Sequence, residues 1–264
     1  MALLRPSQRG RGGVTIPRIH VPRILKEGIH LELGKENLRY VRSVLRMKKG
    51  DRLTVMDGTG WECEAVIDHI SKDGVSAAVI KECVPRDKAI HITLMQSLPK
   101  ANKMDFIVQK ATELGVDHIF SFQSSRSIPR LTPAKTGLKL ERWQTIAVEA
   151  ARQCGRSDVP DIQGILSFEE ALSWPGHGAL KLIFWEEEAA LGVKQVLRDK
   201  GHDGIRDMSV IVGPEGGFTK EEVAQAGEMG FVSVSLGKQV LKVETAVLAV
   251  LSIIQYEKGI FNGA

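Results

Sequence analysis

Short apolar runs alternate with segments of helical periodicity over the last two thirds of the chain. The runs predict buried strands at residues 92–96, 118–123, 180–185, 209–212 and 231–235. Between them, apolar side chains recur at helical spacing, and two of the predicted helices end at Gly115 and Gly155. Strands that alternate with helices are typical of an α/β fold, in which helices cover both faces of a parallel sheet.

The first 90 residues follow a different pattern, in which polar and apolar positions alternate over short segments. The turn Asp57-Gly58-Thr59-Gly60 joins the runs 51–56 and 61–67 into a predicted hairpin, and residues 29–33 alternate as a half-buried strand does. One short helix is predicted from the apolar positions Leu38, Val41, Val44 and Leu45. This pattern favours a small β-rich domain.

The two patterns divide the chain into domains. We expect a flexible tail at residues 1–15, which contain arginines and glycines but no acid. The β-rich domain follows at residues 16–86, and the α/β domain occupies residues 90–264. Residues 84–89, which contain a proline and several charges, are predicted to form a linker between them.

Two glycine-bearing loops each follow a predicted buried strand and lead into a predicted helix. The first is Gly213-Pro214-Glu215-Gly216-Gly217, and the second runs from Gly237 to Ala246. Because the carboxyl ends of parallel strands meet at one edge of a sheet, the two loops predict a ligand cavity there. The first loop matches neither a P-loop nor the dinucleotide fingerprint. An ordinary strand–turn–helix joint is the alternative interpretation.

The helices that follow these loops have distinct patterns. The first begins with a predicted capping box, Thr219 with Glu222, and ends at Gly230. The second, at residues 244–256, is apolar on nearly all sides and must therefore be buried on several sides. Its surroundings are either the core of the domain or a subunit interface.

The composition is typical of a soluble globular protein, with 43% hydrophobic and 26% charged residues. No apolar run reaches the ~18 residues of a membrane span, so we expect no membrane partner. Cys63, Cys83 and Cys154 are an odd number without Cys-x-x-Cys spacing. This spacing argues against a zinc site and against a disulfide framework, and it fits a reducing cytosol.

Positive charge is concentrated near the N-terminus. The chain carries a net charge of +4, whereas residues 1–52 alone hold 13 lysines and arginines against 4 acids. Such a footprint is expected of a protein that binds a nucleic acid backbone, and a solvated basic face is the alternative. The candidate contacts are Arg18, Arg39, Arg42, Arg46, Lys48 and Lys49, with Arg152 and Arg156 beside a helix end further along the chain.

Several short motifs keep a fixed order along the chain. They are residues 44–47 (Val-Leu-Arg-Met), 103–115, 153–156 (Gln-Cys-Gly-Arg), 213–218 (Gly-Pro-Glu-Gly-Gly-Phe), 235–237 (Ser-Leu-Gly) and 244–246 (Glu-Thr-Ala). Together they resemble the RsmE family, ribosomal RNA methyltransferases of the SPOUT superfamily. The resemblance extends from about Ile16 to about Tyr256.

This resemblance implies a fold, a cofactor and partners. The fold would be a SPOUT-type parallel sheet with a C-terminal trefoil knot, plus an N-terminal PUA-like β-barrel domain that binds RNA. The protein would act as a cytoplasmic homodimer, with S-adenosylmethionine as its cofactor and no metal. Its partner would be 16S ribosomal RNA within the small ribosomal subunit, methylated at N3 of a specific uridine.

The resemblance also implies which residues form the site. The cofactor would be held by Trp185, Glu186, Val212, Gly213, Pro214, Glu215, Gly216, Gly217, Leu236, Gly237, Val240, Leu241, Val243, Thr245 and Ala246. Because N3 of uridine loses its proton as it attacks, a carboxylate would accept the proton and a cation would stabilise the developing charge. Glu244 is the predicted acceptor, with Glu215 as the second candidate, and Arg126 is the predicted cation. Glu244 alternatively serves only the helix N-terminus.

The chain departs from the family pattern at four positions. Ser125 stands where the family has glutamate, Gln239 and Lys242 where it has arginine, and Val243 where it has threonine. Lys242 keeps the charge but not the bidentate fork of arginine. Two alternative functions therefore stay open. One is a SPOUT methyltransferase that acts on another RNA or on a ribose 2′-hydroxyl, and the other is a non-catalytic RNA-binding relative.

Overall fold

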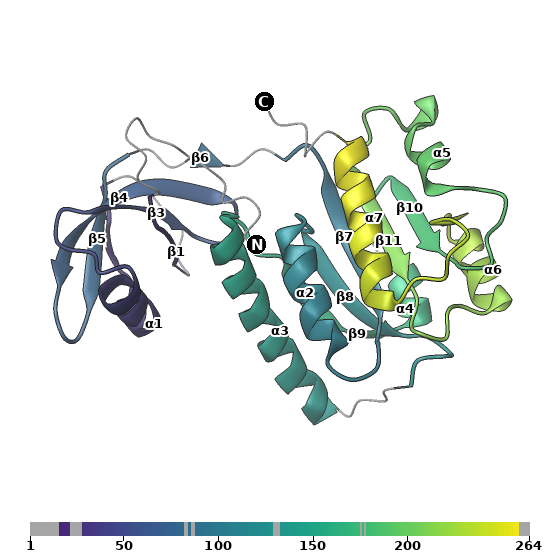
Figure 1. Ribbon diagram of the computed structural model, residues 1–264, viewed down its shortest axis with the longest axis horizontal. Coiled ribbons are helices and arrows are strands. Elements are labelled where there is room, and N and C mark those ends of the chain that lie inside the picture. Colours follow the sequence, from purple (N-terminus) through teal and green to yellow (C-terminus); the bar gives the residue numbers. More distant parts are fainter. Residues whose placement is uncertain are drawn as a thin grey trace. The chain divides into compact units, whose positions relative to one another are not determined.

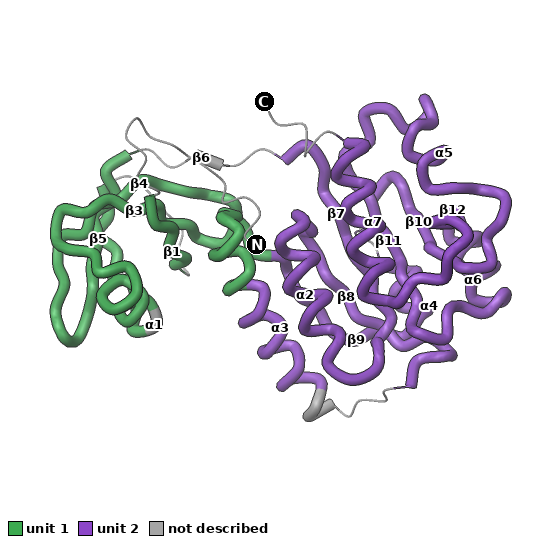
Figure 2. The backbone as a smooth tube through the Cα atoms, viewed as in Figure 1, with its two compact units in different colours: residues 1–87, 148–159 green, residues 88–147, 160–264 purple. Residues whose placement is uncertain are grey.

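The computed structural model describes residues 16–21, 28–81, 84–85, 88–128, 133–174, 176 and 178–258, so the predicted tail at residues 1–15 lies outside the described residues. The chain divides into two compact units (Figure 2). The first comprises residues 1–87 and 148–159, and the second comprises residues 88–147 and 160–264. The segment 148–159 joins the first unit because Val159 donates its backbone N–H to Gly58 O at 3.0 Å.

The second unit is built on a sheet whose described strands all run parallel. The strands are β7 (His91–Ser97), β8 (His118–Gln123), β9 (Asp161–Ser167), β10 (Leu180–Phe184), β11 (Asp207–Val212) and β12 (Val232–Val234). Their order across the sheet is β12-β10-β11-β7-β8-β9 (Figure 1). The predicted α/β fold is confirmed, and five strands match the predicted runs to within two residues. Strand β9 was not predicted from the sequence. It is an edge strand whose residues are all at least partly exposed, so it does not form a buried apolar run.

Helices cover both faces of this sheet. On one face, α4 (Phe168–Leu172) and α6 (Lys220–Glu228) contribute Phe168 and Ala226 to a buried cluster with Phe120. On the other face, α2 (Lys103–Glu113) and α7 (Val243–Glu257) lie side by side (Figure 1). The unit also holds α5 (Val193–Leu197) and most of α3 (Pro133–Cys154).

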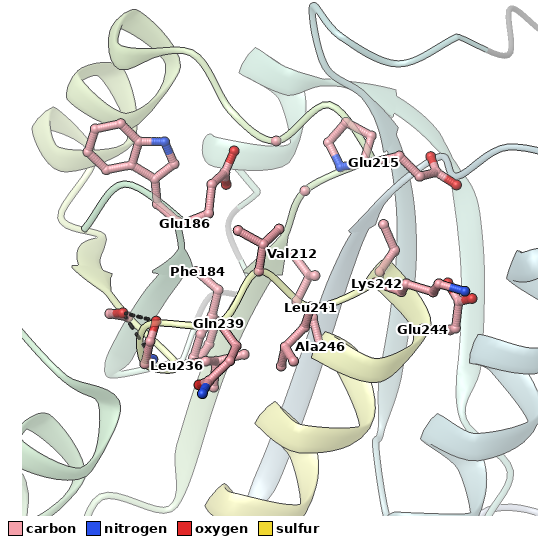
Figure 3. Close-up of a pocket in the computed structure, with 18 of the residues that line it drawn as sticks. Phe184, Glu186, Val212, Glu215, Leu236, Gln239, Leu241, Lys242, Glu244 and Ala246 are labelled. Carbon is pink, nitrogen blue, oxygen red and sulfur yellow. Dashed lines mark hydrogen bonds between the residues drawn. The ribbon is translucent and has the colours of Figure 1, made fainter. Parts of the chain in front are cut away.

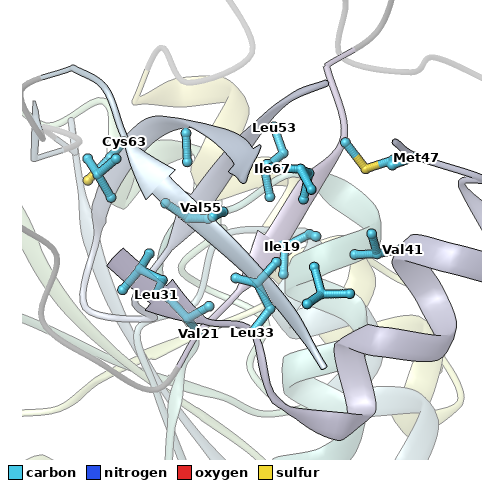
Figure 4. Close-up of a cluster of buried hydrophobic side chains, with 14 residues drawn as sticks. Ile19, Val21, Leu31, Leu33, Val41, Met47, Leu53, Val55, Cys63 and Ile67 are labelled. Atoms are coloured by element: carbon cyan, nitrogen blue, oxygen red, sulfur yellow. The ribbon is translucent and has the colours of Figure 1, made fainter. Parts of the chain in front are cut away.

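The first unit is β-rich, as predicted. Its strands are β1 (Arg18–His20), β2 (His30–Glu32), β3 (Arg52–Met56), β4 (Trp61–Ile70), β5 (Val75–Val79) and β6 (Val84–Pro85). The order is β1-β3-β4-β5-β2, and β6 pairs with β4. Alternate apolar side chains of these strands meet in a core that includes Ile19, Leu53 and Ile67 (Figure 4). The predicted hairpin is the antiparallel β3–β4 pair.

Three expectations about the first unit were wrong. Val84 and Pro85, assigned to a linker, pair with the start of β4. Val44 was placed on the buried stripe of a helix, yet its side chain is 64% exposed. The reason is that α1 (Gly34–Arg39) continues as a π turn, Tyr40–Val44, whose wider winding breaks the helical spacing. Cys63 on β4 is disulfide-bonded, contrary to the expectation from the odd cysteine count.

Candidate functional site

A cavity of about 510 Å³ opens at the carboxyl ends of β10, β11 and β12 (Figure 3). Three segments form most of its lining: the end of β10 from Phe184 to Glu186, the first glycine loop after β11, and the second loop between β12 and α7. The strand order brings these segments together, because β10 pairs with β11 on one side and with β12 on the other. The cavity has the size and place of a small-ligand site in an open α/β sheet.

The first glycine loop lines the cavity with backbone that carries no side chain at Gly213 and Gly217. Gly217 has a φ of +67°, and a Cβ built there would lie 1.6 Å from Glu186 Oε1. Across the same loop, a Cβ on Gly213 would lie 3.1 Å from the ring of Phe218. Below the loop, the buried Gln96 donates from Nε2 to Gly213 O at 3.1 Å and to Val212 O at 3.3 Å. This side chain fixes the start of the loop to the end of β7.

The second loop is more open. Ser235 Oγ accepts the N–H of Gly237 at 3.1 Å, which turns the chain away from β12. Val240 is then 83% exposed and Leu241 is 37% exposed, before Val243 enters the core as the first residue of α7. The loop therefore offers apolar side chains both to the cavity and to the surface.

Lys103, the first residue of α2, links the charged groups of the cavity. This residue was not among the predicted site residues. Its Nζ lies 2.9 Å from Glu215 Oε1 and 3.2 Å from Glu244 Oε2. These partners raise the pKa of Lys103, the Glu215 hydrogen bond foremost. Burial raises the pKa of Glu215, but hydrogen bonds from Lys103 and from the backbone outweigh it and leave the pKa lowered.

Glu244 has one oxygen without a conventional partner. Its pKa is lowered, first by a hydrogen bond from its own backbone N–H and further by Lys103. Its Oε2 is screened from solvent and, within the described structure, forms no hydrogen bond of normal geometry, although Lys103 Nζ lies 3.2 Å away. This contact between Lys103 Nζ and Glu244 Oε2 is an ion pair. Glu244 thus contributes a carboxylate of lowered pKa to the cavity wall.

Arg126 does not line the cavity. Its Nη1 donates to Gly216 O at 2.8 Å and to Phe218 O at 3.3 Å, so the side chain holds the first glycine loop from the β8 side. Arginine has further N–H donors in the same planar fork. The structure therefore gives Arg126 a supporting contact with the loop, one residue away from the wall.

Most of the residues predicted to hold the cofactor lie together on the cavity wall, and whether they bind it stays a prediction. Those on the wall are Trp185, Glu186, Val212, Gly213, Pro214, Glu215, Gly217, Leu236, Gly237, Val240, Leu241, Val243 and Ala246. Gly216 and Thr245 do not line it. The wall also includes residues that were not predicted: Lys103, Phe184, Ser235, Gln239 and Lys242. Of these, Phe184, Ser235, Gln239 and Lys242 are close neighbours in sequence of predicted residues. Lys103 begins the motif at residues 103–115, but that motif was not assigned to the cavity.

The basic residues predicted to contact RNA all lie in the first unit and fall into two groups. Arg39, Arg42, Arg46, Lys48 and Lys49 are exposed around α1 and the turn that follows it. Three other predicted contacts are engaged within the unit. Arg18 pairs with Glu62, and Arg152 pairs with Glu149 while its guanidinium lies 4.5 Å from the centre of the Tyr40 ring.

Arg156 is the third engaged residue and requires a correction. Its side chain is only 7% exposed and forms an ion pair with Asp158. A guanidinium that is buried and neutralised in this way cannot reach an RNA phosphate without breaking the pair. We therefore assign Arg156 to the packing of the first unit rather than to RNA binding.

In the part of the chain that the structure describes, no three histidines, cysteines or acidic residues are grouped so that they would hold a metal ion. None of the described helices is both long and apolar enough to cross a membrane.

The sequence matches two protein-family models. Residues 86–255 match an RNA methyltransferase domain, and residues 33–80 match an RNA methyltransferase PUA domain. The first match contains the parallel sheet and its cavity, and the second contains the exposed basic residues around α1.

Individual relatives agree over nearly the whole chain. Ribosomal RNA small subunit methyltransferase E of Bacillus subtilis is 32% identical over 242 residues, which cover 90% of this chain and 94% of the relative. The enzyme of the same name from Buchnera aphidicola subsp. Acyrthosiphon pisum is 30% identical and covers 94% and 96%. The solved structure of a ribosomal RNA small subunit methyltransferase E from Neisseria gonorrhoeae, bound to S-adenosyl methionine, superposes with a TM-score of 0.79 at 34% identity over 92% and 98% of the chains.

Proposed function

The chain belongs to the ribosomal RNA small subunit methyltransferase E family, and we propose that it transfers a methyl group from S-adenosylmethionine to N3 of a specific uridine in 16S ribosomal RNA. The cavity at the carboxyl edge of the sheet is the observation that carries this proposal. A relative of the same fold, 34% identical, was solved with S-adenosyl methionine bound.

The cavity fits this cofactor in size and in chemistry. Its volume of about 510 Å³ lies within the usual range for small-ligand sites. The carboxylate of Glu186 suits a ligand that carries an ammonium and a sulfonium group, and Leu236, Leu241 and Ala246 offer apolar surface to adenine. The bare backbone at Gly213 and Gly217 lets the ligand approach main-chain hydrogen-bonding groups. Bound there, the cofactor supplies an activated methyl group on a good leaving group.

The residues of the chain then have to orient the nucleophile and accept its proton. N3 of uridine is a weakly acidic imide that carries a proton at neutral pH, so a base increases its reactivity. We assign this role to Glu244, which lines the cavity and whose carboxylate is kept ionised beside Lys103. Arg126 supports the loop through Nη1, and its other N–H donors are proposed to stabilise charge on the carbonyl oxygens of the base.

RNA binding is assigned to the first unit. Arg39, Arg42, Arg46, Lys48 and Lys49 are exposed and are proposed to contact phosphates of the small-subunit RNA. A target base within folded RNA has to be extruded before it can reach a cavity of this kind, at a cost of a few kcal/mol.

We further propose that the enzyme is a cytoplasmic homodimer with a trefoil knot. The resemblance of the glycine loops to those of the SPOUT superfamily supports the knot. Exposed apolar side chains support the dimer: Val240 is 83% exposed before α7, Tyr256 is 59% exposed on α7, and Phe106 is 41% exposed on the neighbouring α2. A second copy of the chain would remove this apolar surface from water. The ribosomal RNA substrate favours the cytoplasm.

The first experiment is a methyl-transfer assay. Small ribosomal subunits that lack the modification are incubated with S-adenosylmethionine and the protein, and the digested nucleosides are analysed by mass spectrometry. We expect 3-methyluridine from the wild type and about a hundredfold less from Glu244→Gln, which cannot accept the proton. A 2′-O-methylated nucleoside would instead support action on a ribose hydroxyl. No methylated nucleoside, together with no binding of S-adenosylmethionine in calorimetry, would favour the non-catalytic alternative.

A further inference from the structure

Lys103 connects three segments that are far apart in the sequence. It begins α2, Glu215 lies in the glycine loop after β11, and Glu244 lies in the first turn of α7. The ammonium group reaches both carboxylates, at 2.9 Å and 3.2 Å. All three residues line the cavity. The two ion pairs of Lys103 therefore form a charged side of the cavity.

The connection is better defined than an ordinary surface ion pair. The three side chains are 31%, 23% and 27% exposed, so each is largely covered. Glu215 is held a second time, because the backbone N–H of Lys100 lies 3.2 Å from both of its carboxylate oxygens. The backbone around Lys103 is also specific, since Ala101 two residues earlier has a φ of +54°. A lysine anchored in this way can hold the glycine loop at a fixed distance from α7.

The charges that face Glu244 come from several elements. Lys103 of α2 lies against its Oε2, and Lys242 precedes it in the chain. Glu215 of the glycine loop shares the ammonium of Lys103 from the other side. Both carboxylates have a lowered pKa, with Lys103 among the causes in each case. Without this lysine, two carboxylates would face each other with less compensation, and the pKa of Glu244 would rise.

We propose that Lys103 is a positioning residue for methyl transfer, which holds Glu244 in place and ionised against the cofactor loop. The inference rests on the proposed function, because it assumes that Glu244 receives the proton of the nucleophile. Lys103 then does not touch the substrate. It acts through Glu244, by fixing the direction of the carboxylate, and through Glu215, by fixing the wall of the cavity.

The sign of the pH dependence follows from this arrangement. Glu244 is active as the carboxylate, so methyl transfer rises as the pH passes upward through its pKa. Removal of Lys103 raises that pKa, and the rising limb of the rate profile moves to higher pH. Arginine at the same position keeps the positive charge and is expected to restore most of the profile.

The test compares Lys103→Met and Lys103→Arg with a matched control, Lys110→Met. Lys110 lies on the same helix, is 30% exposed and is also ion-paired, to Glu113 at 2.8 Å, but it does not line the cavity. The readouts are kcat on small ribosomal subunits between about pH 4 and 9, the Kd of S-adenosylmethionine by calorimetry, and thermal unfolding. The range begins at acidic pH because the lowered pKa of Glu244 puts the wild-type rising limb there. We expect Lys103→Met to lower the plateau kcat about tenfold and to shift the rising limb upward, with partial rescue in Lys103→Arg and no change in Lys110→Met.

The possible failures are distinguishable. If the wild type methylates RNA and Lys103→Met behaves as Lys110→Met does at every pH, the positioning role is wrong while the proposed function stands. If Lys103→Met and Lys110→Met both lower kcat about tenfold and neither shifts the pH dependence, α2 is generally destabilised, and the positioning role is again wrong. If the wild type binds the cofactor but methylates no RNA, the proposed function itself fails. Glu244→Gln removes the group whose titration gives the rising limb, so adding Lys103→Met should leave the pH profile of that variant unchanged, and a change would contradict action through Glu244.

Discussion

Gly217 shows at the scale of one residue how the cavity depends on the absence of a side chain. Its φ of +67° is unfavourable for any residue with a Cβ, and that Cβ would meet the carboxylate of Glu186. Glu186 is exposed and can move, so the contact alone is tolerable. A movement of Glu186 does not relieve the backbone strain, and this strain lies in the loop that we propose binds the cofactor.

Gly217→Ala is therefore expected to weaken the binding of S-adenosylmethionine. The strain is roughly 1 kcal/mol, and with the displacement of Glu186 we expect about a tenfold higher Kd, measured by calorimetry. Gly227→Ala is the control, because Gly227 lies in α6 at an ordinary φ with open space around it. That variant should keep the Kd and gain about 0.5–1 kcal/mol of stability. Equal Kd values for both variants and the wild type would contradict the assignment of the loop.

At the scale of elements, two helices begin with the same capping box but in different surroundings. In α6, Thr219 Oγ1 accepts the N–H of Glu222, and the Glu222 carboxylate accepts the N–H of Thr219 at 2.9 Å. The other oxygen of Glu222 accepts the N–H of Ser125 at 2.8 Å, which ties α6 to the end of β8. In α4, the corresponding residues Ser167 and Glu170 form the same box, and among the described residues Glu170 makes no such long-range bond.

This difference predicts unequal costs for one substitution. Glu170→Ala removes a local cap and should lower the free energy of unfolding by about 1 kcal/mol. Glu222→Ala also leaves the N–H of Ser125 without its partner, and Glu222 is only 8% exposed, so we expect a loss of about 2–3 kcal/mol. Urea denaturation of both variants measures the difference. Equal losses would mean that the bond to Ser125 contributes nothing to stability.

At the scale of the whole molecule, the chain separates two kinds of chemistry between its two units. The exposed basic residues around α1 belong to the first unit, and the cavity belongs entirely to the second. The two family models divide the chain in a similar way, with the PUA domain at residues 33–80 and the methyltransferase domain at residues 86–255. RNA affinity and cofactor affinity should therefore respond to different substitutions.

The double variant Arg42→Gln/Arg46→Gln tests this division. We expect weaker RNA binding and a salt dependence whose log–log slope falls by about 1.5–2, for two lost phosphate contacts, with the Kd of S-adenosylmethionine unchanged. Arg52→Gln is the control, because Arg52 is 61% exposed but already paired with Glu64 at 2.6 Å. RNA titrations between about 50 and ~300 mM salt measure the slope. Loss of both affinities in the double variant would contradict the division of labour.

The sequence by itself determined the features that are encoded locally. Buried strands appear as apolar runs, so β7, β8, β10, β11 and β12 were found from the sequence. The capping box at Thr219 and Glu222 is likewise local, and the structure contains it. Glycine permits a positive φ and a close approach of the backbone to a ligand, and the two glycine loops do lie on the wall of one cavity.

Tertiary structure decided which distant groups meet. Strand order is not recorded in periodicity, so nothing in the sequence placed Lys103 between Glu215 and Glu244. The same reason explains Arg126, whose contacts with Gly216 and Phe218 exist only because β8 and the loop end at one edge of the sheet. It explains Arg156 as well, since its burial depends on the packing of residues 148–159 with the first unit. Periodicity and turn chemistry report the surroundings of each residue, whereas the pairing of charges depends on the path of the whole chain.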